Sequence, residues 1–227
     1  MSIYYQDDAV TLHHGDCLEI LDWLEADVLV TDPPYGIDGH LSFGWKGRKP
    51  AGGHQRTHAK PAWDTTLDAR DAALALWGDG RPYAVFGSPA RLDGALPCRE
   101  FPLVWDKGSV GMGDVDFPWG RGYELVYVNG PGWHGRRESP IIRVVHSPTA
   151  VSNAGHPTPK PLPLMRAIIA KAHRGIIADP FAGSGSTLVA AKELGYPAVG
   201  VERDERYCEL AARRLAQGVL DFGEEPA

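Results

Sequence analysis

The chain has few cysteines and no long apolar run. Its 227 residues include only three cysteines, Cys17, Cys98 and Cys208, which are scattered and odd in number. Such sparse cysteines exclude a disulfide framework and are typical of reduced thiols in a cytoplasmic protein. No apolar run is long enough to span a bilayer, and the amino terminus lacks the basic and apolar regions of a signal peptide. We therefore expect a cytoplasmic protein with no membrane partner.

Acidic residues are missing between Gly39 and Trp63, although the whole chain carries a net charge of −6. A negatively charged molecule is not a general nucleic-acid binder, but a local basic patch can still contact phosphates. The stretch belongs to a long segment, 36–62, that is rich in glycine and shows little periodicity, which favours a basic mobile loop. Its candidate DNA contacts are Lys46, Arg48, Lys49, Arg56 and Lys60.

The composition favours a single domain that spans residues 1–227, because a hydrophobic fraction of 43% can supply a sizeable core. Short apolar runs predict strands at 10–13, 27–31, 83–86, 101–105, 123–128 and 141–145. Helical spacing and capping residues predict helices at 18–24 and 64–77. The last third alternates helices at 164–173, 186–194 and 204–217 with strands at 176–179 and 198–202. This alternation predicts an α/β fold with a parallel sheet.

One stretch that can carry chemistry follows the apolar run Val28–Val30. Asp32, Pro33, Pro34 and Tyr35 place a carboxylate, a stiff turn and an aromatic ring at the carboxyl end of that strand. Ligands bind at this edge of open α/β sheets. Taken alone, the tetrapeptide fits an ordinary Asp-Pro turn as well as it fits a binding site.

A second stretch, 179–187, reads Asp-Pro-Phe-Ala-Gly-Ser-Gly-Ser-Thr. Gly183 and Gly185 allow a tight turn from strand to helix and a close approach of a ligand to the backbone. Glu202 ends the next predicted strand, where a carboxylate can accept both hydroxyls of a ribose.

Three ligands compete for this turn. A phosphate-binding loop needs a lysine before the Ser/Thr pair, and none is present. A dinucleotide site needs a third glycine, and Leu188 occupies that position. The remaining candidate is an adenosyl ligand that places no phosphate in the turn, namely S-adenosylmethionine.

Together the two stretches resemble the DNA amino-methyltransferases that act on adenine N6 or cytosine N4. Segment 14–18 (His-Gly-Asp-Cys-Leu) and segment 156–161 (His-Pro-Thr-Pro-Lys-Pro) resemble further parts of that family, although Pro159 stands where glutamine is more usual. The tetrapeptide precedes the glycine turn in the chain, as in the permuted β group. The resemblance implies a Rossmann-like methyltransferase fold, with a seven-stranded, mostly parallel sheet, one antiparallel edge strand and helices on both faces.

The resemblance also implies roles for individual residues. Asp32 and the Pro33 carbonyl would accept hydrogen bonds from the target amine, and Tyr35 would stack on a base flipped out of the duplex. The implied catalytic residues are Asp32, Pro33, Pro34 and Tyr35. The implied cofactor-binding residues are Asp16, Cys17, Leu18, Asp32, His156, Thr158, Lys160, Asp179, Phe181, Gly183, Gly185, Ser186, Thr187 and Glu202.

No metal is predicted, because His54 and His58 are four residues apart but no acid or cysteine accompanies them. A short target-recognition insertion is expected at 130–152, where Arg136, Arg137 and Arg143 are candidate DNA contacts. The expected partner is double-stranded DNA, in a bacterial or phage-type host and in the setting of restriction-modification. A homodimer is compatible with the sequence.

The resemblance therefore predicts methyl transfer to adenine N6 in DNA. Within the family, Asp-Pro-Pro-Tyr accompanies adenine more often, and serine in the first position accompanies cytosine more often. Cytosine N4 stays open as the alternative target. A non-catalytic DNA-binding or cofactor-binding module with the same fold is the alternative from another class.

Overall fold

The computed structural model describes residues 2–36, 66–89, 94–109, 118–120, 122–145 and 159–217. They belong to two compact units. The first unit is formed by residues 1–31, 132–135 and 147–227, and the second by residues 32–131 and 136–146. Apart from Gly36, the predicted basic loop lies outside the described residues.

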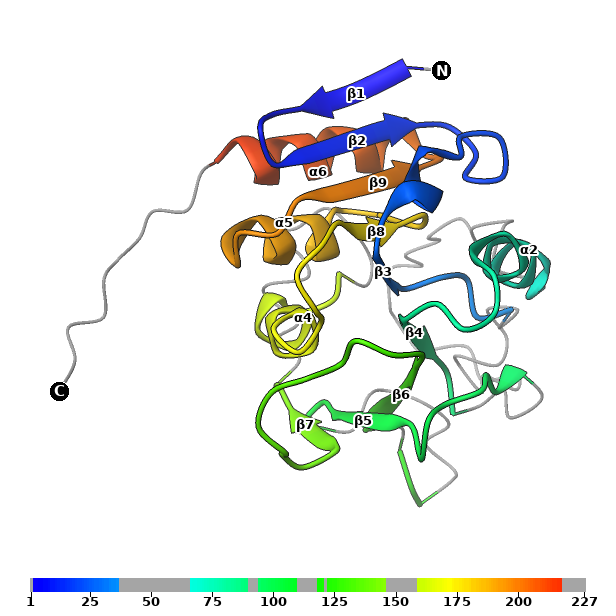
Figure 1. Ribbon diagram of the computed structural model, residues 1–227. Helices are drawn as coiled ribbons and strands as arrows, with labels where there is room; N and C mark the ends of the chain where they lie inside the picture. The colour runs from blue at the N-terminus through cyan, green and yellow to red at the C-terminus, as the bar shows by residue number, and fades with distance from the viewer. Residues whose placement is uncertain are drawn as a thin grey trace, which may run out of the picture. The chain divides into compact units, whose positions relative to one another are not determined.

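Within the described part of the first unit, five strands form a sheet (Figure 1). In spatial order they are β1 (Ser2–Gln6), β2 (Val10–His14), β9 (Ala198–Glu202), β8 (Ile177–Asp179) and β3 (Val28–Thr31). The last four run parallel to one another, while β1 pairs antiparallel with β2 at the edge. All residues of β3 and β8 are buried, as is typical of parallel strands covered on both faces. The carboxyl ends of four strands therefore meet at one edge of this sheet.

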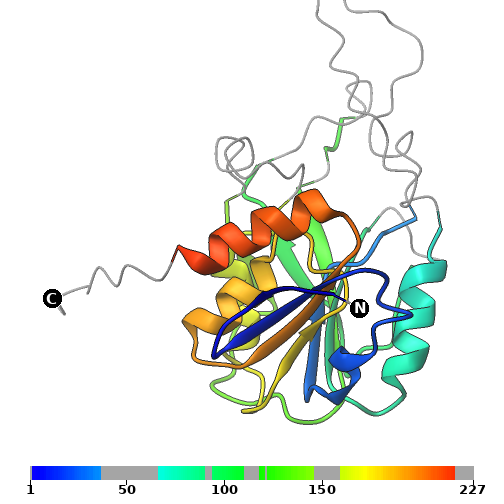
Figure 2. The ribbon, with the colours of Figure 1, turned by 90° about the horizontal axis from the view of Figure 1, so that it is seen from above.

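The three helices predicted in the last third are present in the first unit: α4 (Leu162–Ile169), α5 (Ser186–Glu193) and α6 (Glu205–Ala216). Helices α5 and α6 match the predicted bounds to within one residue, whereas α4 ends at Ile169 and not at 173. Helix α5 packs against β8 and β9, and α6 packs against β1, β2 and β9. Figure 2 shows α5 and α6 on the same side of these strands. Helix α6 is capped by Asp204, whose side chain accepts a hydrogen bond from the backbone N–H of Arg206. Its apolar side chains at 208, 211 and 215 are buried, at the spacing of one helix face.

The segment after β2 differs from its prediction. In place of an α-helix over 18–24, a single 3₁₀ turn, η1 (Asp22–Glu25), packs against β8 and β9. Trp23 is fully buried there, and its Nε1–H donates to the Cys17 carbonyl at 2.9 Å. One buried indole thus anchors a segment too short for an amphipathic helix.

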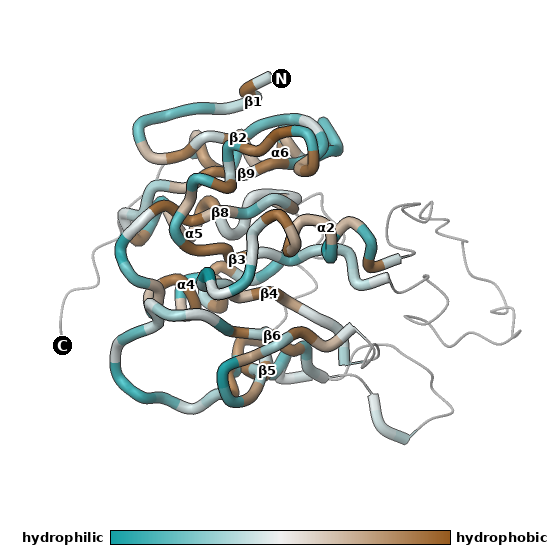
Figure 3. Tube along the Cα trace, turned by 45° about the vertical axis from the view of Figure 1, so that its right-hand side comes forward, coloured by the Kyte–Doolittle hydropathy of each residue, from teal (hydrophilic) through white to brown (hydrophobic). Residues whose placement is uncertain are grey.

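The second unit contains α2 (Asp68–Trp77) and the strands β4 (Tyr83–Gly87), β6 (Tyr123–Asn129), β5 (Leu103–Asp106) and β7 (Ile141–Arg143), in that spatial order. Strand β6 pairs antiparallel with both β4 and β5, and β7 pairs parallel with β5. Apolar residues concentrate along the strands (Figure 3), and Trp77, Phe86, Trp105 and Val126 are buried.

The predicted fold class is confirmed, with a different strand count. The described residues hold nine strands rather than seven, and antiparallel pairing is not limited to one edge strand. Strand β1 was not predicted, because its five residues are exposed or half-buried and show no apolar alternation. None of the helices in the described ranges has the length and apolar character needed to cross a membrane.

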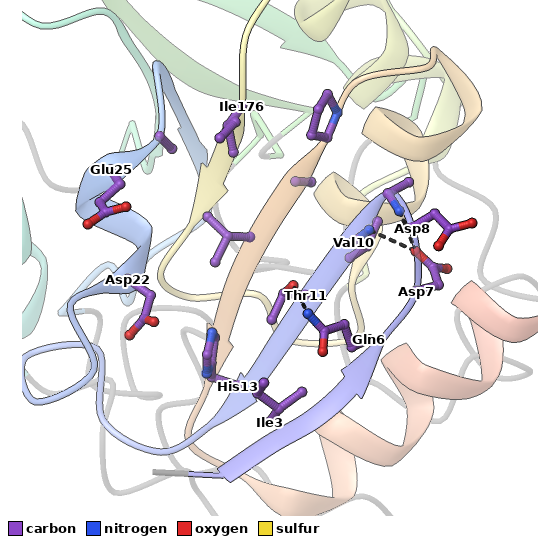
Figure 4. Close-up of a pocket in the computed structure, with 15 residues that line it drawn as sticks. Ile3, Gln6, Asp7, Asp8, Val10, Thr11, His13, Asp22, Glu25 and Ile176 are labelled. Atoms are coloured by element: carbon purple, nitrogen blue, oxygen red, sulfur yellow. Dashed lines mark hydrogen bonds between the residues drawn. The ribbon is translucent and has the colours of Figure 1, made fainter.

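A pocket of about 430 Å³ lies along β2 and β9 in the first unit. Val10 and Ala198, the first residues of β2 and β9, line it together with the acidic side chains of Asp8, Asp22 and Glu25 (Figure 4). None of the predicted site residues that the structure describes lines this pocket, so it is not part of the candidate active site.

Asp7 anchors the turn between β1 and β2. Its carboxylate accepts hydrogen bonds from the backbone N–H groups of Ala9 and Val10 at 2.9 and 2.8 Å. It also accepts from the Tyr5 hydroxyl and from Lys192 Nζ, both at 2.6 Å. Burial raises the pKa of Asp7, but the hydrogen bonds from Lys192, Tyr5 and the backbone outweigh it, so the net pKa lies below its ordinary value.

We expect Asp7→Ala to lower the free energy of unfolding by about 2–3 kcal/mol at neutral pH, because a charged acceptor of several hydrogen bonds is lost. A lowered folded-state pKa stabilises the fold above the unfolded pKa of 3.8, and the difference between parent and variant should shrink as the pH falls below that value. Urea unfolding at several pH values measures both effects. The exposed neighbour Asp8→Ala is the control, and an equal loss in both variants would contradict this role for Asp7.

Candidate active site

The glycine turn joins β8 to α5 at the carboxyl edge of the first sheet. Gly183 and Gly185 have φ angles of 52° and 79°, a left-handed conformation that favours glycine. A Cβ atom on Gly185 would lie 2.9 Å from the Ala211 Cβ, too close for any other residue without movement of α6. The turn therefore needs glycine for its left-handed backbone, and at Gly185 also because a side chain would collide with α6.

Asp179 lies at the start of this turn and is almost fully buried. Its Oδ1 accepts a hydrogen bond from the Thr31 hydroxyl at 2.6 Å and another from the Phe181 backbone N–H at 3.1 Å. Thr31 ends β3, so this contact joins the ends of two parallel strands. Thr31 was not predicted as a site residue. The one sequence signal that could have indicated it is its position directly before Asp32.

Glu202 at the end of β9 holds the turn from the other side. Its Oε2 accepts from the Gly183 N–H and its Oε1 accepts from the Asp204 N–H, both at 2.7 Å. Burial, which outweighs the lowering effect of these hydrogen bonds, raises the pKa of Glu202 above its ordinary value. Each carboxylate oxygen has a second lone pair, so Glu202 can still accept hydroxyl hydrogens from a ligand.

The predicted residues Asp16, Cys17 and Leu18 form the turn after β2. The Gly15 N–H donates to the Glu202 carbonyl at 2.9 Å, so this turn begins beside the end of β9. Asp16 Oδ1 accepts from the Leu18 N–H at 2.9 Å. Burial raises the pKa of the Cys17 thiol to about 12, which keeps the thiol protonated and excludes it as a nucleophile.

Ser186 and Thr187 are buried at the start of α5. Arg214 of α6 reaches back to this point: its Nη1 donates to the Ser184 carbonyl at 2.6 Å and lies 3.2 Å from the Ser186 hydroxyl. The sequence analysis did not single out Arg214 as part of the site. Its guanidinium ties α6 to the glycine turn.

The predicted catalytic tetrapeptide begins the second unit. The Tyr35 hydroxyl lies 2.6 Å from Asp32 Oδ1 and 3.1 Å from Glu124 Oε2. Burial, followed by the charges of the two carboxylates, raises the pKa of Tyr35 well above its ordinary value, so the phenol stays protonated at neutral pH. Glu124 in turn accepts from Lys107 Nζ at 2.5 Å. Neither Glu124 nor Lys107 was predicted as part of the site.

The remaining predicted residues are distributed as follows. Lys160 is buried in the first unit, whereas Lys46, Arg48, Lys49, Arg56, Lys60, His156 and Thr158 lie outside the described residues. Arg136 and Arg137 are exposed. Arg143 lies on β7, mostly exposed, with its Nε 3.7 Å from Asp106 Oδ2.

The segment expected to be an insertion, 130–152, is divided between the two units. Residues 132–135 belong to the first unit, where Trp133 forms a β-bridge with Ala172 and the His134 N–H donates to the Lys171 carbonyl at 2.8 Å. Residues 136–146 belong to the second unit. The described residues contain no group of three or more His, Cys, Asp or Glu side chains that could hold a metal ion.

The fold is that of known DNA methyltransferases. PvuII DNA methyltransferase (cytosine-N4-specific) is similar, with a TM-score of 0.65 and 14% identity over 98% of this chain and 90% of that chain. The M1.HpyAVI–SAM complex is similar with a TM-score of 0.60 and 22% identity, over 91% of this chain and 98% of that chain. At these identities the likeness shows the fold alone.

The sequence comparisons give the family. A family model described as DNA methylase (N6_N4_Mtase) matches residues 98–213, which is just over half of the chain. The putative methylase YubD of Escherichia coli (strain K12) is 35% identical over 217 residues, which cover 89% of this chain and 88% of that protein. The chain therefore belongs to the N6/N4 DNA methylase family, and the resemblance based on the two motifs is confirmed.

We expect Arg214→Met to lower the free energy of unfolding by about 1–3 kcal/mol, because it leaves the buried polar groups of Ser184 and Ser186 without their donor. Arg213→Met is a matched control, since Arg213 is exposed and its Nε pairs with Glu209 one turn earlier, at 2.6 Å. Thermal and urea unfolding measure the difference. Equal losses in the two variants would show that Arg214 does not hold the turn.

Proposed function

We propose that this DNA methyltransferase transfers a methyl group from S-adenosylmethionine to the exocyclic N6 of adenine in double-stranded DNA. The proposal rests on one observation: the glycine turn, Asp179 and Glu202 meet at one edge of the first sheet. Thr31, which donates a hydrogen bond to Asp179 at this edge, is directly followed in the chain by Asp32. Membership of the N6/N4 DNA methylase family supports methylation of an amino group on DNA. The choice between adenine and cytosine is the finer part of the proposal.

The residues at this edge fit an adenosyl cofactor. Gly183 and Gly185 leave the turn without side chains, which lets a ligand approach the backbone closely. Glu202 would accept the ribose hydroxyls, and Asp16 would accept a hydrogen bond from the adenine amine. When bound, S-adenosylmethionine supplies an activated methyl group on a sulfonium centre.

Asp32 has the chemistry that the target amine requires. The lone pair of an exocyclic amine is delocalised into the aromatic ring, so the nitrogen is a poor nucleophile. Hydrogen bonds from the amine to the Asp32 carboxylate and to the Pro33 carbonyl would favour a pyramidal nitrogen with an available lone pair. Holding the nitrogen in this geometry supplies much of the acceleration for an in-line displacement. Tyr35 would stack on the flipped base, which is worth about 1–3 kcal/mol.

The target base is inferred from the tetrapeptide, because Asp-Pro-Pro-Tyr at 32–35 accompanies adenine more often within the family. Arg136, Arg137 and Arg143 would contact DNA from the second unit, together with the basic residues of segment 36–62.

The base assignment has a direct test. Genomic DNA from cells that express the chain, and that lack methyltransferases of their own, is digested to nucleosides and analysed by mass spectrometry. We expect N6-methyladenine. N4-methylcytosine would overturn the base assignment, and the absence of any modified base would favour a non-catalytic module with the same fold.

We expect Asp32→Ala to reduce the transfer of tritiated methyl groups to duplex DNA by at least about 100-fold, because the amine loses its charged acceptor. Cofactor affinity, measured by calorimetry with S-adenosylhomocysteine, should stay within about threefold of the parent value, a free-energy change of less than 1 kcal/mol. Asp68→Ala, at an exposed position in α2, should behave as the parent does. Equal labelling by parent and variant would remove Asp32 from the mechanism.

A further inference from the structure

The Tyr35 hydroxyl lies between two carboxylates. Asp32 Oδ1 is 2.6 Å away and Glu124 Oε2 is 3.1 Å away, and both can only accept when ionised. A phenol has one hydrogen, so it donates fully to one carboxylate at a time. The shorter distance places that hydrogen on Asp32 in this structure, with Glu124 within reach as a second acceptor.

Glu124 is fixed in place by the pairing of two strands. Strands β5 and β6 are antiparallel, with Trp105 opposite Glu124, and the Lys107 N–H donates to the Gly122 carbonyl at 2.8 Å. Lys107 Nζ then reaches Glu124 Oε1 at 2.5 Å and lies 4.8 Å from the centre of the Trp105 ring. The side chains of Glu124 and Lys107 are only 15% and 24% exposed, so solvent screens this ion pair weakly.

The hydrogen bond between Tyr35 and Asp32 competes with the reaction. In the proposed mechanism, on which this inference depends, Asp32 must accept a hydrogen from the target amine. A Tyr35 hydroxyl that stays on Asp32 would compete for the same carboxylate. A hydroxyl displaced from Asp32 without another acceptor would be left unsatisfied in a half-buried position, which is costly.

We propose that Glu124 is a positioning residue that accepts the Tyr35 hydroxyl when the target amine binds to Asp32, and that the ion pair with Lys107 holds Glu124 in the orientation needed for this exchange. No proton is transferred in this step: the phenol rotates its hydrogen from one carboxylate to the other. Tyr35 thereby remains close to the base while Asp32 becomes available to the amine.

The variant Glu124→Gln tests the exchange with little change of shape. Lys107 can pair only with the amide oxygen of the glutamine, so the amide NH₂ group faces Tyr35 and cannot accept its hydrogen. We expect kcat for methyl transfer to duplex DNA to fall about tenfold, while KM for S-adenosylmethionine stays within about twofold. Lys107→Met should give a similar loss, and Lys107→Arg, which keeps the charge, should recover most of the activity.

A double-variant cycle separates this role from simple bracing of β5 against β6. Tyr35→Phe removes the hydroxyl, so adding Glu124→Gln to Tyr35→Phe should change kcat by less than about twofold. Glu100→Gln, an exposed carboxylate in the same unit, is the matched control. Thermal unfolding of each variant reports any loss of structure, which a bracing role would produce equally with and without the Tyr35 hydroxyl.

The outcomes distinguish this inference from the proposed function. Suppose that the parent methylates DNA and that Asp32→Ala does not. If Glu124→Gln is then fully active, or if its effect adds to that of Tyr35→Phe, the proposed exchange is wrong and the proposed function stands. If the parent transfers no methyl group to DNA, the proposed function fails and this inference fails with it. Loss of kcat in Glu124→Gln that disappears in the Tyr35→Phe background supports the exchange.

Discussion

The hydrogen bond from the Gly183 N–H to Glu202 is the contact on which the candidate cofactor site depends. It is possible only because β8 and β9 are parallel neighbours, so that the turn after β8 lies beside the end of β9. The same carboxylate accepts the N–H of Asp204, the residue that caps α6. One half-buried acid therefore sets the path of the chain on both sides of the site. Its raised pKa reflects the burial that this position requires.

The second unit is organised around a different electrostatic constraint. Two carboxylates, Asp32 and Glu124, face one phenol, and Lys107 offsets part of their charge. Carboxylates that converge on one hydroxyl are costly unless each has a donor. Lys107 supplies the donor for Glu124, and Tyr35 supplies one for Asp32. In the exchange proposed above, Asp32 is the carboxylate whose hydrogen-bond donor changes when a target amine binds.

Most secondary-structure elements were predictable because their signals are local. The glycines of the turn, the aspartate that caps α6 and the apolar runs of β3 and β9 each specify a conformation within a few residues. Strand β1 was missed because its residues are exposed or half-buried, and it is defined by pairing with β2 and by the turn around Asp7. The 3₁₀ turn that replaced a predicted helix owes its form to the burial of Trp23.

The sequence alone determined the family and the two motifs, because each is carried by adjacent residues whose types limit what they can do. The tertiary structure decided which distant side chains support them. Thr31 and Asp179 are 148 positions apart in the chain, and Tyr35 and Glu124 are 89 apart. Such contacts depend on which strands become neighbours and in which register. No short stretch of sequence contains that information, because strand pairing follows from the burial of the whole sheet.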